Sequence, residues 1–74
     1  MYMDDKRSRF KKVAENRTNK IINMIELLGN CANTSNYEYT EKEVKKIFEA
    51  IEQSLKNTKN KFTIAQSKKR KFEL

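Results

Sequence analysis

The stretch YTEKEVKKIFEAIEQSL, residues 39–55, decides the fold. Thr40 is a good helix N-cap, and Glu43 three residues later completes a capping box, in which each side chain bonds the backbone N–H of the other residue. Tyr39 is placed to pack on Val44 as a hydrophobic staple. Apolar residues then recur every three or four positions: Val44, Ile47, Phe48, Ile51 and Leu55. This spacing puts them on one face and predicts an amphipathic helix.

The residues before this stretch predict a first helix of about 20–25 residues, beginning near Asp4 or Asp5, whose charge suits a helix N-terminus. Two rows of heptad spacing run along it: Ala14, Ile21 and Leu28, and Phe10, Arg17 and Met24. Gly29, the only glycine, follows the last periodic residue and predicts a left-handed C-terminal cap.

Arg17 interrupts an apolar row, and two interpretations are open. The side chain can lie at the edge of the stripe, with its methylenes packed and its guanidinium in water. Alternatively, it faces a carboxylate or a phosphate across the helix pair.

The segment NCANTSNYE, residues 30–38, predicts a loop, because Asn, Ser and Thr side chains compete with backbone hydrogen bonding. Tyr37 and Tyr39 are expected to pack under the helices and close the open end of the core. A stacking platform for nucleic-acid bases is the alternative, and the acidic or neutral neighbours argue against it.

The second helix is expected over about residues 41–60, with continuation to Phe62 because no Pro or Gly intervenes. Residues 63–74, TIAQSKKRKFEL, form either a short third element or a basic tail. Their KKRK run, residues 68–71, has the composition of a nuclear-localisation signal, which is a weak match because such runs are usually solvated.

These elements predict an all-α fold, an antiparallel hairpin of helices at about residues 5–28 and 41–60. We expect a hairpin domain over residues 1–62 and a basic C-terminal segment over residues 63–74. A 74-residue chain buries little surface, and each helix has one apolar face. A homodimer in which two hairpins form a four-helix bundle is therefore expected.

Charge is distributed unevenly along the chain. The net charge is +7, and it lies at the two ends: residues 1–20 carry seven Lys/Arg against three acids, and residues 56–74 carry seven against one. An antiparallel hairpin would bring these regions together, as expected of a phosphate-binding surface. The candidate contacts are Arg7, Arg9, Lys11, Lys12, Arg17, Lys20, Lys59, Lys61, Lys68, Lys69, Arg70 and Lys71.

Several classes of function find no support in the composition. There is no His, no Gly-rich phosphate loop and no nucleophile with a base at readable spacing, so we expect no enzyme, no metal and no cofactor. Cys31 has no second cysteine to pair with, which suits a reducing cytoplasm. No apolar run is long enough to span a membrane, and the apolar faces are needed for the core, which argues against peripheral membrane binding.

Residues 9–62 resemble a family of short proteins from mobile genetic elements of low-GC Gram-positive bacteria. The resemblance is carried by Arg9–Phe10, Arg17–Thr18, Leu28–Gly29–Asn30, Ser35–Asn36–Tyr37, Tyr39–Thr40 and Ile47–Phe48. It implies a genetic setting and no particular activity. In that setting, small proteins commonly regulate DNA or block host systems.

The sequence thus predicts a small nucleic-acid-binding accessory or regulatory protein, with DNA and RNA both open. No helix-turn-helix can be read, because a loop of about ten residues replaces the short turn and a third helix is missing, so sequence-specific readout is not supported. The alternative is a protein-interaction module or inhibitor, for example an anti-CRISPR-like one, that binds a host nucleoprotein machine through a helix face.

Overall fold

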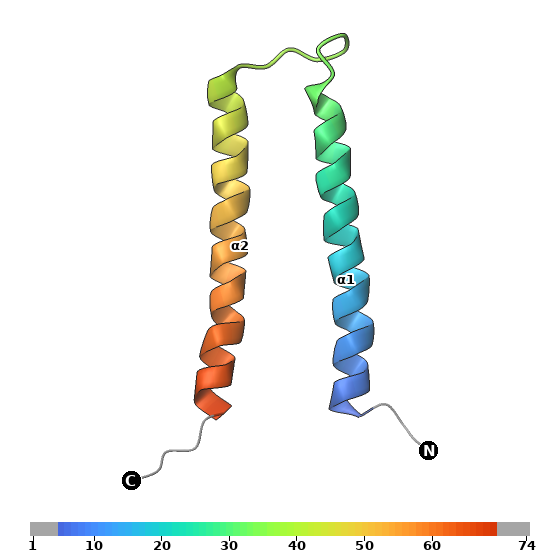
Figure 1. The fold of residues 1–74 in the computed structure, drawn as a ribbon, viewed down its shortest axis with the longest axis vertical. Helices are drawn as coiled ribbons and strands as arrows, with labels where there is room; N and C mark the ends of the chain where they lie inside the picture. The colour runs from blue at the N-terminus through green and yellow to red at the C-terminus, as the bar shows by residue number, and fades with distance from the viewer. Residues whose placement is uncertain (1–4, 70–74) are drawn as a thin grey trace. The chain divides into compact units, whose positions relative to one another are not determined.

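In a computed structural model, the chain is described over residues 5–69, with side chains through Ser67. Two long helices, α1 (Lys6–Gly29) and α2 (Glu41–Lys69), are separated by a short 3₁₀ helix, η1 (Asn30–Ala32), and a loop (Figure 1). No strand occurs among the described residues, so the predicted all-α class is confirmed. The chain divides into two units, residues 1–38 and 39–74, which contain α1 and α2 respectively.

Helix α1 begins where the two aspartates predicted it. Asp5 is the N-cap, with extended backbone, and its Oδ1 accepts a hydrogen bond of 2.8 Å from the backbone N–H of Ser8. This bond stabilises the ionised carboxylate and lowers the pKa of Asp5. The helix has 24 residues, within the predicted length.

The predicted left-handed cap at Gly29 is wrong. Gly29 has φ −59° and ψ −29°, which is ordinary right-handed helix, and it is the last residue of α1. Asn30 is the C-cap, and its backbone N–H donates to the carbonyl oxygens of Leu27 and Leu28. The chain tightens into η1 instead of reversing its backbone twist, so the final carbonyls find donors without a residue at positive φ.

The loop after η1 is organised by Asn33. Its Oδ1 accepts a 2.9 Å hydrogen bond from the backbone N–H of Ser35, and its carbonyl accepts from the N–H groups of Asn36 and Tyr37 at 3.2 and 3.0 Å. An asparagine that bonds the backbone two residues ahead forms an Asx turn. The loop predicted over residues 30–38 is therefore confirmed for residues 33–38, while residues 30–32 form η1.

Helix α2 begins with the predicted capping box. The Thr40 N–H donates to Glu43 Oε1 at 2.9 Å, and the Glu43 N–H donates to Thr40 Oγ1 at 3.1 Å. The first helical backbone bond, from Val44 N–H to the Thr40 carbonyl, is 3.1 Å long. Val44 is half-buried and Tyr39 is 40% exposed, and the staple between them stays a prediction.

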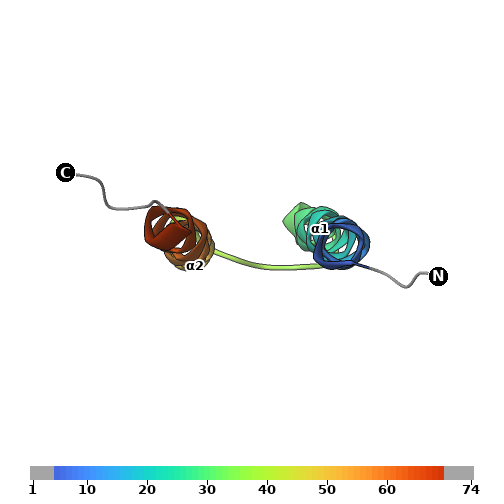
Figure 2. The same cartoon turned by 90° about the horizontal axis from the view of Figure 1, so that it is seen from below.

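Helix α2 is longer than predicted. It continues through residues 61–69, so residues 63–69 form neither a separate third element nor a non-helical tail. Its turns overlie one another in the end-on view of Figure 2, as in an unbroken helix. Thr58 and Thr63 donate their hydroxyl protons to the carbonyls of Ser54 and Lys59, at 2.9 and 3.3 Å. These weak helix formers therefore satisfy their hydroxyls within the helix instead of ending it.

The apolar stripes of both helices are open to solvent. No residue of the segment 5–67 is buried, and only Ala14, Leu28, Val44 and Ile51 are half-buried. Ile21 is 59% exposed and Leu55 58%, and the rings of Tyr37 and Tyr39 also lie open. Neither helix alone can bury its stripe, so the core predicted for a hairpin requires a second surface.

Candidate nucleic-acid interface

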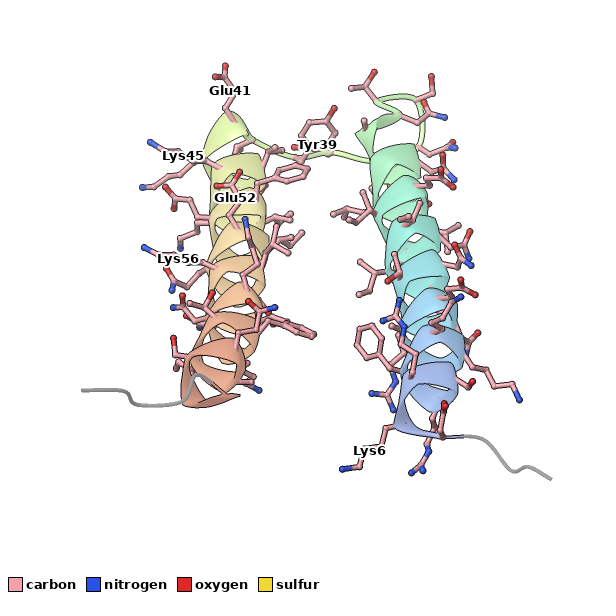
Figure 3. All side chains as sticks on the ribbon, turned by 60° about the horizontal axis from the view of Figure 1, so that its bottom comes forward. Lys6, Tyr39, Glu41, Lys45, Glu52 and Lys56 are labelled. Carbon is pink, nitrogen blue, oxygen red and sulfur yellow. The ribbon has the colours of Figure 1, made fainter. Side chains whose placement is uncertain are left out.

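The first half of α1 is strongly basic on every side. With about 100° between successive residues, Lys11 and Lys12 fall away from the apolar stripe, while Arg9 and Lys20 fall together along one edge of it. Lys6, which Figure 3 labels, and Arg7 fall at the two edges of the stripe at the start of the helix. All of these side chains are exposed. The structure thus places the predicted α1 residues around the helix and not on a single face.

Arg17 differs from the other α1 cations in its position. It lies in the row of Phe10 and Met24, which are 51% and 63% exposed, near the middle of the apolar stripe. Arg17 itself is exposed and has no ion pair with any other described residue. The structure therefore leaves its predicted carboxylate or phosphate partner as a prediction.

The basic residues of α2 follow an acidic first half. Glu41 and Glu43 lie in the first turn, and Glu52 is the last acid of the described helix. Between Glu52 and the end of the described helix, every charged residue is a cation, and Lys56 projects to the same side of α2 as Lys45, eleven residues earlier (Figure 3). The predicted contacts Lys59 and Lys61 are exposed. Lys68 and Lys69 continue the helix, and Arg70 and Lys71 lie outside the described residues.

The two helices differ in the charges at their N-terminal ends. The N-terminal end of a helix carries partial positive charge, so acids stabilise it and cations destabilise it. Helix α2 follows this rule, with acids in its first turn. Helix α1 violates it: the first turn contains no acid, the last turn no base, and Lys6, Arg7 and Arg9 stand at the positive end. Among the described residues of this helix end, the capping carboxylate of Asp5 is the one acid that offsets them.

No ion pair neutralises the α1 cations within the described part of the chain. Each first-turn cation costs the helix about 0.3–1 kcal/mol at low ionic strength. The basic start of α1 is therefore not explained by the stability of the helix. An anion placed against it would relieve the repulsion and would also interact with the free N–H groups of the first turn.

Other kinds of site have little to support them. A shallow open depression on α1 is lined by Ala14, Glu15, Thr18 and Asn19, which is too exposed to enclose a small molecule. Over residues 5–69, no three His, Cys, Asp or Glu side chains come together as metal ligands would. In the same range, neither helix has the length of apolar sequence that crossing a bilayer requires.

One feature of α1 was missed from the sequence. Asn16, Asn19 and Asn23 are spaced three and four residues apart, so they form a row on the face opposite the apolar stripe. All three are exposed, and their side chains have no hydrogen-bonded partner in the described segment. The helical spacing of the asparagines is the signal that would have found them.

Comparison with protein-family models, curated proteins and solved structures finds no match to this chain. The resemblance to proteins of mobile genetic elements therefore stays an expectation, and the function has to be argued from the residues themselves.

Proposed function

We propose that this protein is a small, non-catalytic nucleic-acid-binding accessory or regulatory protein of a mobile element. The observation that carries the proposal is the basic start of α1, where cations stand at the positive end of the helix with no acid in the first turn. Stability alone disfavours this arrangement, whereas a polyanionic ligand makes it favourable.

The proposal includes packing of the helices as an antiparallel hairpin. The stripe of α1 advances in alternating steps of four and three: Phe10, Ala14, Arg17, Ile21, Met24 and Leu28. The stripe of α2 has the same steps and the same length: Val44, Phe48, Ile51, Leu55, Thr58 and Phe62. Each spans about 27 Å. Paired in opposite directions, every member of one stripe meets a member of the other, from Leu28 with Val44 to Phe10 with Phe62.

This register supports convergence of the basic regions. If Phe10 and Phe62 are level, the cations at the start of α1 lie beside Lys59 and Lys61. The acids Glu41 and Glu43 then lie at the loop end. The combined basic surface is what we propose for phosphate contacts.

We also propose that two hairpins associate as a four-helix bundle. A single pair of helices leaves part of each apolar face in water, and Ile22 and Ile25 on the flank of the α1 stripe are each 49% exposed. A second copy supplies a matching surface through two-fold symmetry. The dimer would carry two copies of the basic surface.

The test compares two lysine pairs that are alike except for their position. Lys11 and Lys12 lie in the basic half of α1, whereas Lys45 and Lys46 lie in the acidic half of α2, and all four are exposed. We expect the double change Lys11→Gln and Lys12→Gln to weaken binding to DNA or RNA and to reduce the slope of log affinity against log salt by about 1.8 on duplex DNA. The same change at Lys45 and Lys46 should leave both nearly unaltered.

The binding would be measured by fluorescence anisotropy across a range of salt, with circular dichroism to establish that each variant is helical. No binding by folded wild-type protein at about 50 mM salt, where electrostatic contacts are strong, would refute the proposal. Equal losses of binding affinity in the two double variants would refute the placement of the phosphate-binding surface on α1.

A second candidate is a protein-interaction module or inhibitor that binds a host nucleoprotein machine through a helix face, as in counter-defence. The observation that favours it is the exposed apolar stripe of each helix, including Phe48 and Phe62 at 46% and 55% exposure. Pull-down from host lysate with and without nuclease separates the two functions. A protein partner that stays bound after nuclease treatment, and is lost with Phe62→Ser, supports the second one.

A further inference from the structure

We propose that the asparagine row of α1, Asn16, Asn19 and Asn23, reads adenine-containing base pairs in the major groove of duplex DNA. This inference rests on the proposed function and names its substrate. The first step is that these asparagines do not contribute to the stability of the described structure. The three amides are exposed, lie opposite the apolar stripe and bond no other described residue. Asparagine is also among the weaker helix formers, so the row does not stabilise α1.

The second step concerns the charges beside the row. Going around the helix at about 100° per residue, Lys11 falls on one side of the asparagines and Arg9 and Lys20 on the other. The major groove admits a helix and has a phosphate backbone along each wall. A helix whose amides face the base edges therefore presents cations to both walls. Lys12 lies in line with the asparagines, about one turn before Asn16, so the same face also presents a cation to the groove, while Glu15 and Glu26 lie between Lys11 and the row.

The third step concerns the bases. The amide of asparagine can donate to N7 and accept from the N6 amino group of adenine at the same time. From Asn16 to Asn23, the row advances about 10 Å along the helix, which corresponds to roughly three base pairs. A helix-turn-helix is not required, because one continuous helix can lie in the groove, as the basic regions of zipper proteins do.

Glu15 borders the row, between Lys11 and Asn19 on the same side of the helix, and Glu26 borders it there as well, about one turn beyond Asn23. The Glu15 carboxylate repels phosphate and cannot donate to adenine N7, whereas a glutamine amide can donate to N7 and accept from N6. We therefore expect Glu15→Gln to strengthen binding to A·T duplexes.

The experiment measures anisotropy with duplexes of equal length, one of A·T pairs in mixed order and one of G·C pairs, at fixed salt. Wild-type protein should bind the A·T duplex about tenfold more tightly or better, since each good bidentate pair discriminates by roughly that factor. Asn19→Ala should remove most of the preference while keeping the salt slope. Asn60→Ala, at an exposed asparagine of α2, is the matched control and should keep the preference.

A third duplex with 7-deazaadenine lacks the N7 acceptor in the major groove, while its minor groove is unchanged. Loss of the preference on this duplex supports major-groove reading, and a preference that persists overturns it. Salt-dependent binding of equal strength to A·T and G·C duplexes also overturns the inference, but leaves the proposed function standing. No binding to any duplex or single strand refutes both.

Discussion

The capping box at the start of α2 allows a prediction in which one chemical change has opposite effects at two positions. Thr40→Ala removes the acceptor of the 3.1 Å bond from the Glu43 N–H, and the return bond of 2.9 Å then loses the geometry that Thr40 gave it. N-cap threonine to alanine costs about 1 kcal/mol. Thr63 lies inside the same helix, is exposed and bonds only a carbonyl of its own helix at 3.3 Å. There alanine is the better helix former by about 0.5 kcal/mol.

The assay is thermal and urea unfolding followed by circular dichroism, with amide hydrogen exchange at Glu43 as the local readout. We expect Thr40→Ala to lower the free energy of unfolding and to speed exchange at the Glu43 amide. We expect Thr63→Ala to raise the free energy of unfolding. For a two-state transition in a chain of this size, 1 kcal/mol corresponds to roughly 4–8 °C in melting temperature. A Thr40→Ala protein as stable as wild type, or a Thr63→Ala protein destabilised as much as Thr40→Ala, would refute the assignment of the cap.

The remaining predictions concern α1. The bond from the Ser8 N–H lowers the pKa of Asp5 in the folded protein. The ionised Asp5 therefore stabilises the protein above the unfolded pKa near 3.8, and this stabilisation is lost as the pH falls through the lowered folded pKa. The variant Asp5→Asn, which also caps well, should remove this pH dependence in a circular-dichroism titration. Adding salt from about 10 to 150 mM should raise the helix content of a fragment of residues 1–38 by screening the cations at residues 6–12, and a fall in helix content would contradict the dipole argument. Arg17→Leu should raise the melting temperature, because the hairpin would bury the row of Phe10, Arg17 and Met24. A decrease of about 1 in the slope of log affinity against log salt would identify Arg17 as a phosphate contact.

Several local features could be predicted because each depends on residues within one turn of helix. The capping box needs only Thr40 and Glu43 at the correct spacing, and Asp5 needs only the N–H of Ser8. The same is true of the loop around Asn33, whose side chain bonds the backbone two residues ahead. The basic character of the candidate interface could also be read directly, because exposed charges keep the positions that the helical repeat assigns to them.

Two helix ends could not be predicted, because they depend on competition between structures of nearly equal energy. At Gly29, a left-handed cap and a right-handed helix followed by a 3₁₀ turn both satisfy the last carbonyls, and a glycine permits either. At residues 57–69, weak helix formers leave the end of α2 undetermined by propensity. The hydroxyls of Thr58 and Thr63 find carbonyls within the helix and permit it to continue.

By itself, then, the sequence determined the helical class, the start of each helix and the separation of apolar from charged faces, since periodicity and caps are local properties. Only the three-dimensional structure decided that α1 runs through Gly29 into η1 and that α2 extends unbroken to Lys69. It also showed that the three asparagines of the row bond no other described residue. The physical reason is that these features depend on backbone conformation and on which polar groups find partners, and a pattern of residue types does not specify either.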